Sequence, residues 1–376
     1  MNTGVGRHIA MVITRGDVIG GAQTHVAELT VGLIARGHRV TVFAGGKGAF
    51  SDRLADAGAD VVDLPGLSRE IAPLRDANTI LRFGRMLKHH APDLVACHSS
   101  KAGIVGRAAA RLAGIPSVFT AHGWAFAEGI PQPRRWFYRL IERRMSRFCR
   151  AVITVSEADA RLAVEGGVAR HAPLIAIHNG LPDHPPAPFP AHETEPRLLM
   201  VARLVEQKNH AALLRALARV TDRAFHLDLV GEGPLGDELK ALAKSLGLQD
   251  RVTFHGYRSD VPAFIERASL VVLLSHWEGL PISLIEAMRL GRPLVASDVG
   301  GVRELFGASP IGWLVPSDDP ASLASLLRDA LEDHEQLKRL GANARKRFEE
   351  AFSVDVMVDR TLQVYEGAIA GRVPDA

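Results

Sequence analysis

A proline-rich segment divides this chain into two halves that carry the same kind of pattern. Six prolines lie between residues 181 and 196, and proline can neither continue a helix nor donate to a central sheet ladder. On both sides of this segment, short apolar runs rich in β-branched residues alternate with stretches of helical periodicity. We therefore expect two α/β domains, each with a doubly wound parallel sheet, joined by a stiff extended connector.

The short apolar runs are the expected strands of the two sheets. In the first half they cover residues 9–14, 39–44, 60–64, 94–98, 117–121, 151–155 and 174–178. In the second half they cover residues 197–201, 226–230, 251–255, 270–274, 293–297 and 312–315. Ligands of doubly wound sheets bind at the carboxyl ends of the strands. We therefore expect a first domain at residues 1–180, the connector at 181–196, a second domain at 197–353, and a ligand cleft between the domains.

The composition is that of an ordinary globular protein, and 376 residues favour two domains over one. Only Cys97 and Cys149 are present, so we expect no disulfide framework, no zinc cluster and a reducing, cytoplasmic compartment. No apolar run reaches the roughly 20 residues of a membrane helix, and we expect neither a span nor a signal peptide.

The two halves of the chain differ in net charge. Residues 1–184 hold 23 basic against 15 acidic side chains, or +8, and the rest hold 22 against 27, or −5. The two halves are thus expected to face different partners.

Two glutamates flank an expected strand-to-helix turn within residues 275–288, which read S-H-W-E-G-L-P-I-S-L-I-E-A-M. Glu278 lies at the turn, and Glu286 lies about one turn into an expected helix at 282–290. The first N–H groups of such a helix suit a bound phosphate, and the carboxylates could hold the hydroxyls of a sugar nucleotide. The plainer alternative makes both glutamates ordinary helix charges. Glu286, however, interrupts an apolar sequence, and a buried carboxylate needs partners.

This stretch resembles the E-x7-E signature of retaining GT-B glycosyltransferases of the family 4 type. The resemblance spans nearly the whole chain and implies the GT-B fold, in which two Rossmann-like domains face a cleft. It also implies that a last helix, at about 354–370, packs back on the first domain. The implied activity is transfer of a hexose from a nucleotide sugar to a glycan or lipid-linked acceptor, with retention of configuration.

Two cations follow the first strand of the second half, in the sequence V-A-R-L-V-E-Q-K-N. Arg203 and Lys208 are suited to stabilise a diphosphate whose negative charge grows as the glycosyl bond breaks. The spacing R-L-x-x-x-K-N resembles the donor-phosphate clamp of the family, whereas the alternative is an exposed loop with unrelated charges. No D-x-D triplet occurs, so we expect no metal requirement and no cofactor.

A glycine-rich loop follows the next strand, and residues 231–236 formally match G-x-G-x-x-G. This match raises an NAD-binding interpretation. We reject it because the loop contains Pro234 and lies in the second domain rather than in the first βαβ unit. In the resembling family such a loop lies beside the nucleotide. Gly231 and Glu232 would then contact the donor, and Tyr257 with Arg258 would flank the base.

The first half contributes a glycine pair and two polar strand ends. Gly20 and Gly21 open the first expected helix and, with Gln23, resemble the G-G-x-E/Q element that contacts the donor diphosphate or the acceptor. The other expected site residues in this half are His98, Lys101 and His122.

These three residues have a structural and a functional interpretation. An isolated histidine is more often structural. His122, however, follows a strand end and precedes a glycine, and by resemblance it lies near the transferred sugar. His98 and Lys101 resemble acceptor-side groups.

A basic segment of the first half bears on the kind of acceptor. From Arg134 to Arg150 the chain holds seven arginines and a single acidic residue, Glu142, together with several aromatic and aliphatic side chains. This composition suits a helix that lies on an anionic membrane surface. A packed helix with its aromatic face in the core is an equal alternative. No nucleic-acid motif accompanies the charge, so we expect no nucleic-acid partner.

The resemblance also implies individual roles. Glu286 would hold the nucleotide ribose, Glu278 would bind sugar hydroxyls, and Arg203 with Lys208 would neutralise the departing diphosphate. These last three residues and His122 form the expected catalytic set. The remaining donor contacts would come from the start of the helix, at Gly279, Leu280, Pro281, Ile282 and Ser283.

The runs H-S-S-K-A-G and T-A-H-G-W-A-F resemble bacterial enzymes that build exopolysaccharide, lipopolysaccharide or lipid-linked oligosaccharide. They imply a UDP-sugar donor and an undecaprenyl-diphosphate-linked acceptor for an enzyme that is cytoplasmic or peripheral at the inner face of the membrane. Two other classes remain open. A GT-B fold could host a sugar-nucleotide epimerase or hydrolase, or a binding module that has lost turnover.

Overall fold

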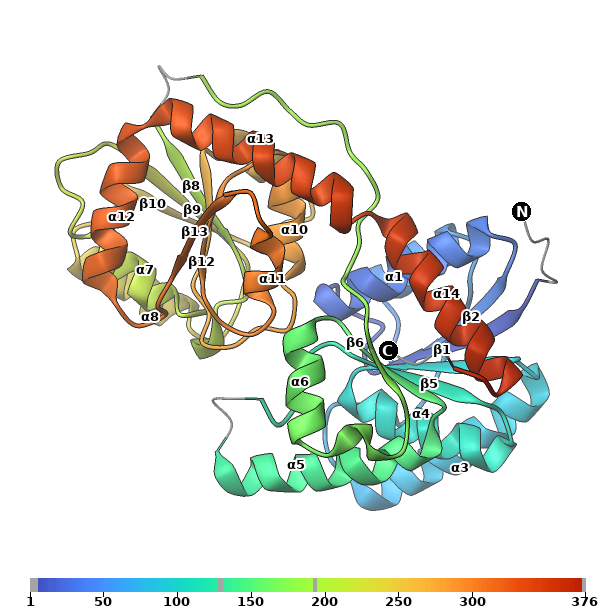
Figure 1. The fold of residues 1–376 in the computed structure, drawn as a ribbon. Coiled ribbons are helices and arrows are strands. Elements are labelled where there is room, and N and C mark those ends of the chain that lie inside the picture. The colour runs from blue at the N-terminus through green and yellow to red at the C-terminus, as the bar shows by residue number, and fades with distance from the viewer. Residues whose placement is uncertain (1–5, 128–130, 192–194, 374–376) are drawn as a thin grey trace. The chain divides into compact units, whose positions relative to one another are not determined.

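The computed structural model describes residues 6–127, 131–191 and 195–373, and it forms two compact units (Figure 1). Unit 1 comprises Met1–Pro182 and Val354–Ala376, and unit 2 comprises Asp183–Ser353. Most of the proline-rich connector is therefore part of unit 2. It is held there by Arg345, which pairs with Asp183 and donates to the carbonyl of His184, and by Arg292, which donates to the carbonyl of Pro188.

Unit 1 contains a seven-stranded parallel sheet in the order β3-β2-β1-β4-β5-β6-β7. Its strands are β1 His8–Ile13, β2 Arg39–Ala44, β3 Asp60–Asp63, β4 Leu94–His98, β5 Ser117–Ala121, β6 Ala151–Thr154 and β7 Leu174–Ala176. All seven expected strands are present, with ends within two residues of the prediction. They form because runs of Val, Ile and Ala can bury both faces of a parallel strand.

Helices cover both faces of this sheet, and successive residues of each strand point to opposite sides. In β1, Ile9, Met11 and Ile13 face a cluster that includes helices α1 and α14, whereas Ala10 and Val12 face the cluster around α3 and α4. The helices of unit 1 are α1 Gly21–Ala35, α2 Ala49–Asp56, α3 Pro73–His90, α4 Ser100–Ala113, α5 Gln132–Met145, α6 Glu157–Glu165 and α14 Val354–Ala370, with short 3-10 turns η1 Ser146–Phe148 and η2 Val168–Arg170.

Helix α14 returns the chain to unit 1 and packs against α1. A Cβ on Gly32 would meet Val358 at 2.5 Å, so the glycine allows the two helices to approach closely. Arg36 forms ion pairs with Asp355 and Asp359 across the same contact. Tyr365 is fully buried beneath the helix. The last helix therefore completes the core of the first unit.

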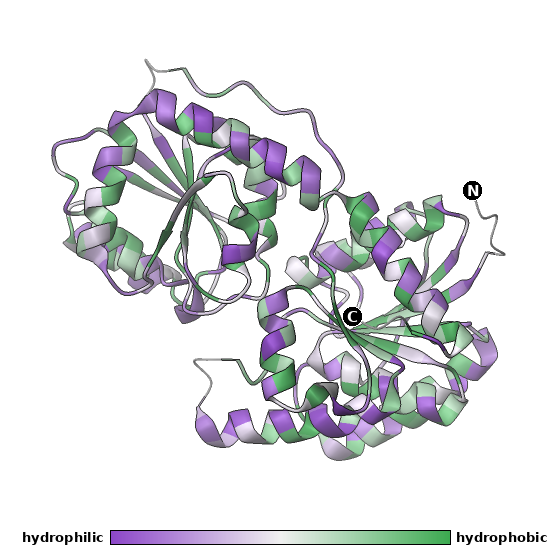
Figure 2. Ribbon diagram, viewed as in Figure 1, coloured by the Kyte–Doolittle hydropathy of each residue, from purple (hydrophilic) through white to green (hydrophobic). Residues whose placement is uncertain are grey.

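Unit 2 contains a six-stranded parallel sheet in the order β10-β9-β8-β11-β12-β13. Its strands are β8 Arg197–Val201, β9 His226–Val230, β10 Val252–Gly256, β11 Leu270–Leu273, β12 Leu294–Ser297 and β13 Gly312–Val315. Its helices are η3 Glu206–Lys208, α7 His210–Leu217, α8 Gly236–Ser245, α9 Val261–Arg267, α10 Ile282–Arg289, α11 Val302–Phe306, α12 Pro320–Glu332 and α13 His334–Ala351. The central strands of both units are hydrophobic and the outer helix faces are hydrophilic (Figure 2).

The order of each sheet reverses at one point. In unit 1 the first strand β1 lies between β2 and β4, and in unit 2 the first strand β8 lies between β9 and β11. Connections on the two sides of such a point lead to opposite faces of the sheet, so the loops separate and leave a crevice at the carboxyl ends of the strands. The loops after β1 and β4, and those after β8 and β11, are therefore where each unit is built to hold a ligand.

No helix within the described part of the chain is long and apolar enough to cross a membrane.

Candidate functional site

Two loops at the switch point of unit 2 bring a lysine and a glutamate together. Lys208 lies in the loop after β8, and its ammonium forms an ion pair with Oε1 of Glu278 in the loop after β11. The hydroxyl of Ser275 donates to the same carboxylate oxygen at 2.6 Å. The two charged side chains are only 18% and 9% exposed. Because an ammonium has three N–H donors, Lys208 can keep this pair and still donate to a ligand.

Backbone contacts fix these two loops relative to each other. The side-chain amide of Gln207 donates to the carbonyl of Trp277 at 2.8 Å, and the N–H of His276 donates to the carbonyl of Gln207 at 2.9 Å. The residue next to Lys208, Asn209, donates to the carbonyl of Ser317. Lys208 and Glu278 are therefore positioned by bonds on both sides of the pair.

A third loop, after β12, supports the turn that carries Glu278. The N–H of Gly301 donates to the carbonyl of Gly279 at 3.0 Å. Gly300 adopts a φ of +52°, and a Cβ at this position would lie 1.9 Å from the carbonyl oxygen of Glu278. Only glycine fits both the conformation and the space. Gly300 is thus part of the support of the site.

Helix α10 begins directly after this turn, with Pro281 as its N-cap residue. The N–H groups of its first turn lack partners within the helix and form its partially positive end. No acidic residue lies in the first turn. Glu286 lies one turn further along, as expected, half-buried between the fully buried Ile285 and Ala287. This end of the helix is therefore suited to an anion, with a carboxylate on each side.

Arg203 is the exposed cation of the loop after β8. Within the described ranges, its guanidinium has no carboxylate partner. It is therefore available to an anionic ligand in a way that Lys208, already paired, is not.

The glycines of the loop after β9 serve a packing purpose. A Cβ on Gly231 would lie 2.0 Å from the carbonyl oxygen of Ala202, and one on Gly233 would lie 2.3 Å from that of Leu204. The loops after β8 and β9 also exchange backbone hydrogen bonds between Leu204 and Glu232 and between Leu235 and Leu204. The formal G-x-G-x-x-G pattern is thus explained by the contact between two loops.

The expected base-binding residues are partly engaged within the protein. The N–H of Tyr257 donates to Oε1 of Glu232 at 3.2 Å, so a nucleotide base cannot use that N–H without displacing Glu232. Arg258 forms an ion pair with Asp260 at 2.7 Å. The side chain of Tyr257 is 55% exposed, so its ring can stack with a base.

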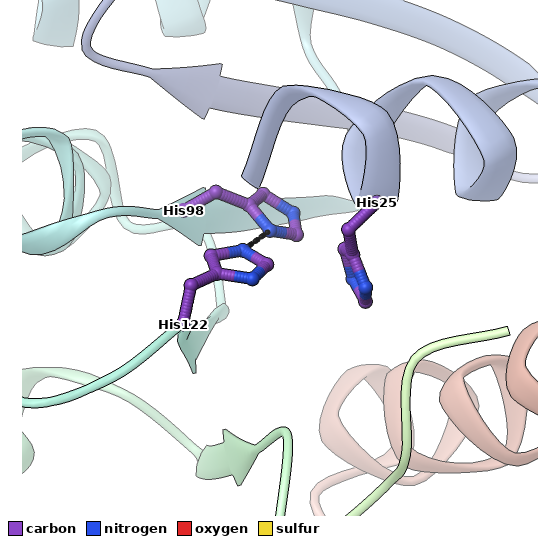
Figure 3. Close-up of side chains that lie close together, drawn as sticks. All are labelled: His25, His98 and His122. Carbon is purple, nitrogen blue, oxygen red and sulfur yellow. Dashed lines mark hydrogen bonds between the residues drawn. The ribbon is translucent and has the colours of Figure 1, made fainter. Parts of the chain in front are cut away.

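In unit 1, three histidines gather at the switch point (Figure 3). His25 lies in α1, His98 is the last residue of β4, and His122 directly follows β5. Nδ1 of His98 and Nε2 of His122 are 3.2 Å apart and share a hydrogen bond. The ring of His25 meets that of His122 edge to face, with 4.7 Å between centroids.

The environment keeps these imidazoles neutral. Nδ1 of His25 lies 2.9 Å from the carboxamide oxygen of Asn179, and because this oxygen only accepts, Nδ1 carries the proton. Burial lowers the pKa of His25 to about 4, and burial lowers the pKa values of His98 and His122 well below their usual range. At neutral pH the cluster can exchange hydrogen bonds with a ligand, but it adds no positive charge.

One nitrogen from each histidine lies within 4.8 Å of the others, and imidazole nitrogens are common ligands of Zn²⁺. A shared metal requires in-plane lone pairs that converge on one point. The rings of His98 and His122 are within 26° of coplanar, with centroids 5.4 Å apart and the contacting nitrogens between them. Those nitrogens face each other, so the arrangement is that of a hydrogen bond rather than of a metal site.

The structure changes the interpretation of several residues of unit 1. His98 is fully buried and cannot touch an acceptor directly, because it ends a central strand beneath His122. The ammonium of Lys101 is neutralised by Asp76 and also donates to the carbonyl of Glu70. Gln23 is 9% exposed, and its amide donates to the carbonyl of Arg15. Gly20 and Gly21 do begin α1, and His122 is partly exposed.

Helix α5 and turn η1 present the basic segment at the surface. Within α5 only Glu142 is buried, where it forms an ion pair with the fully buried Arg107 of α4. Trp136, Phe137 and Phe148 are exposed by 65%, 48% and 41%. The alternative with an aromatic face in the core is therefore wrong for these three rings. The buried pair anchors α5, and Tyr138 and Arg135 also contact the unit, whereas the three aromatic rings face outward.

Sequence comparisons identify the family. The model described as glycosyl transferase 4-like domain matches residues 20–180, and that described as glycosyl transferases group 1 matches residues 186–347. The putative glycosyltransferase EpsD of Bacillus subtilis is 30% identical over 71% of this chain and 75% of its own length. The chain belongs to the GT-B glycosyltransferases of the family 4 type.

Other relatives of this glycosyltransferase agree. An Escherichia coli UDP-Gal:alpha-D-GlcNAc-diphosphoundecaprenol alpha-1,3-galactosyltransferase is 28% identical over 80% of the chain and 82% of its own length. The crystal structure of Anabaena HepE in complex with UDP and glucose superposes with a TM-score of 0.82 at 21% identity, over 96% of this chain and all of that one. The last similarity confirms the fold alone, which is the two-unit α/β fold predicted from the sequence.

The structure of this glycosyltransferase also adds residues that sequence reasoning missed. They are Ser275, Gln207 and Gly300 around Glu278, and His25 with Asn179 around His122. His25 lies only two residues beyond Gln23, so the glycine-pair element could have pointed to it. Gly300 and Gly301 closely follow the end of an expected strand, and this glycine pair could likewise have been recognised as part of the site.

Proposed function

We propose that this glycosyltransferase transfers a hexose from a UDP-sugar to a saccharide linked to undecaprenyl diphosphate. The observation that carries the proposal is the Lys208–Glu278 pair at the positive end of α10, beside the unpaired Arg203. A cationic loop, a helix N-terminus and two flanking carboxylates together match a ligand with a diphosphate between two hydroxyl-bearing rings.

In this proposal unit 2 binds the donor. Arg203 and Lys208 neutralise the diphosphate, Glu278 accepts hydrogen bonds from sugar hydroxyls, and Glu286 accepts them from the ribose. The backbone from Gly279 to Ser283 faces the phosphates, while the exposed ring of Tyr257 stacks with the base. Charge develops on the diphosphate as the bond to the sugar carbon breaks, so these cations act more strongly in the transition state than in the ground state.

Unit 1 contributes the acceptor side. His122, partly exposed and neutral, exchanges hydrogen bonds with sugar hydroxyls, and Gly20 and Gly21 allow backbone to approach the substrate. His98 takes a supporting role, because its contact with His122 leaves a single ring nitrogen of His122 for the substrate. Lys101 is available to an acceptor only if it leaves Asp76.

The proposed transfer retains configuration and needs no metal ion. The bond from the anomeric carbon to the diphosphate breaks, and the bond to the acceptor oxygen forms on the same face. The proton of the acceptor hydroxyl passes to an oxygen of the leaving diphosphate, so no protein base is assigned. The absence of D-x-D and the presence of Arg203 and Lys208 support a metal-free site.

The identities of donor and acceptor draw on relatives. The Escherichia coli relative is named for UDP-Gal and a diphosphoundecaprenol-linked acceptor, and a Campylobacter jejuni relative, 37% identical over 41% of the chain, is named for a diphospho-undecaprenol-linked acceptor. A lipid-linked acceptor places the reaction at the cytoplasmic face of a membrane. The exposed arginines and aromatic rings of α5 and η1 are proposed to contact that surface.

The proposal is tested by incubating the purified protein with a panel of UDP-sugars and an undecaprenyl-diphosphate-linked GlcNAc, followed by NMR of the product. An α-linked product from an α-configured donor supports retention, and an inverted linkage rejects it. Turnover that persists in EDTA supports a metal-free site. Consumption of UDP-sugar at the same rate without acceptor would instead favour the epimerase or hydrolase class.

A further inference from the structure

A second cavity lies in unit 1, at the edge of the sheet opposite to the histidine cluster. It has a volume of about 540 Å³. Its lining includes the first residue of β5 and the residues just before β6, whereas His98 and His122 lie at or after strand ends. The strands are parallel and about five residues long, which separates the two edges by about 15 Å. The cavity is therefore distinct from the substrate site.

Cationic side chains dominate this cavity. Arg111 at the end of α4, Arg147 in η1, Arg150 before β6 and His171 after η2 line it, and no carboxylate does. Within the described residues, none of the three arginines has a carboxylate partner. Other arginines of unit 1, such as Arg39 with Asp60, do form such pairs. The three charges are thus placed together without an internal counter-charge.

The ends of two helices supply only part of a counter-charge. Helices α4 and α14 both end at the cavity, and each helix C-terminus carries about half a negative charge. Two such ends offset about one of three guanidinium charges. Moreover, Nε of Arg147 donates to Nε2 of His171 at 3.1 Å, so the ring nitrogen of His171 that remains for a ligand is the donor Nδ1. The three arginines and His171 therefore all offer N–H groups.

The remaining lining is apolar. Ile115, Phe148 and Ile369 contribute to the walls, and Phe148 is 41% exposed in η1, which directly follows α5. Guanidinium groups bind phosphate oxygens in a planar, bidentate manner that lysine cannot provide. A cavity of this size holds more than a single phosphate.

We infer that this cavity binds the phosphate group of an anionic, partly apolar ligand, and that an anionic phospholipid headgroup is its source. The lipid source rests on the proposed membrane contact of α5 and η1, because Phe148 of η1 both lines the cavity and is exposed. The phosphate chemistry does not rest on the proposed sugar transfer, so the cavity can be tested without any acceptor.

The test compares two double variants of the full chain, each lacking two positive charges. Arg111→Gln/Arg150→Gln changes the cavity, and Arg82→Gln/Arg85→Gln changes exposed arginines of α3, outside both the lining and the proposed membrane contact. One arm measures binding to phosphatidylglycerol vesicles, with phosphatidylcholine as reference. The other measures broadening of the 31P signal of glycerol 3-phosphate. UDP affinity and melting temperature should remain those of the parent in both variants.

We expect the cavity variant to lose vesicle affinity at least fivefold more than the control variant and to abolish the 31P broadening that the control keeps. If the two variants differ only in the 31P broadening, the cavity is a phosphate site whose ligand is a free phosphate ester. If they differ only in vesicle binding, its ligand is the lipid headgroup. Equal behaviour of the two variants in both arms would overturn the inference, because charge alone would then explain binding.

Discussion

Lys208 and Glu278 lie 70 residues apart in the sequence and form an ion pair at the switch point of the second sheet. The pair is held by Ser275 and lies at the start of α10. Desolvated pairs of this kind contribute little net stability, but the loss of one partner is costly because the other charge stays buried. In the proposed function the pair is a positioning device, in which Glu278 orients the Lys208 ammonium toward the diphosphate of the donor.

Replacing Lys208 by Ala should lower kcat/KM by about 10²- to 10³-fold, the range found when one electrostatic stabiliser of a transition state is removed. Initial rates at several UDP-sugar concentrations measure this change. Lys240→Ala, on the exposed surface of α8, serves as the control and should leave the rate unchanged. In the double variant Lys208→Ala/Glu278→Gln the unpaired carboxylate is gone, so stability should recover while activity stays low. Parent-like kinetics in Lys208→Ala would remove Lys208 from the site.

Ser275→Ala should reduce kcat/KM about tenfold and lower the free energy of unfolding by about 2 kcal/mol, because a hydrogen bond to a charged group is lost. Urea unfolding and steady-state kinetics provide the two measurements. Ser245→Ala is the matched change, since its hydroxyl bonds only to a nearby carbonyl on the surface of α8. Equal effects of the two substitutions would mean that Ser275 does not support Glu278.

Gly300→Ala should destabilise unit 2 by about 3 kcal/mol or more, and should also weaken UDP binding, because the new Cβ displaces the backbone of Glu278. Gly247→Ala is the control for backbone strain. The φ of Gly247 is also positive, at +71°, but a Cβ there would meet nothing within 4 Å. The substitution should therefore lower the free energy of unfolding by only about 1 kcal/mol. Calorimetric titration with UDP measures the binding. Retained UDP affinity in Gly300→Ala would contradict the proposed support of the turn.

Acidification should destabilise unit 1 through its buried histidines. The pKa of His25 is about 4 in the folded protein because of burial, and about 6.5 in the unfolded chain. Between these values the unfolded chain binds the proton and the folded protein does not, so stability falls as the pH decreases from about 6.5 toward 4. Urea unfolding at pH 7.5 and 5.0 measures the slope. His25→Gln should flatten it, whereas the exposed His89→Gln should not.

Trp136→Ser should weaken binding to vesicles that contain anionic lipid several-fold, because the exposed indole contributes apolar area beside the arginines of α5. A flotation assay at moderate salt measures the bound fraction. Leu81→Ser removes an apolar side chain of similar exposure, 52%, from α3 and should have no effect. Parental binding by Trp136→Ser would argue against α5 as the membrane contact.

The strands and the start of each site helix were predictable because their signals are local. A run such as residues 117–121 can bury both faces of a strand whatever its neighbours are, and the glycine pair at Gly20 and Gly21 marks the start of α1. The position of Glu278 at a turn and of Glu286 in the following helix is likewise fixed by periodicity and by Pro281. For these features the sequence alone was sufficient.

The exposure and the partners of polar side chains depended on contacts far apart in the sequence. His98 ends β4 and His122 directly follows β5, yet His98 is fully buried because it still lies within a central strand of the sheet. The pairing of Lys101 with Asp76 joins the first turns of two helices, α4 and α3.

The sequence by itself determined two α/β units, the order of their elements and the chemical types at the strand ends, since these follow from local periodicity and turn residues. Only the tertiary structure decided that Lys208 pairs with Glu278, that His122 is backed by His98, and that three arginines share a second cavity. Such relations require loops from separate strands to meet at one sheet edge, and strand order, unlike strand formation, is set by the packing of the whole unit.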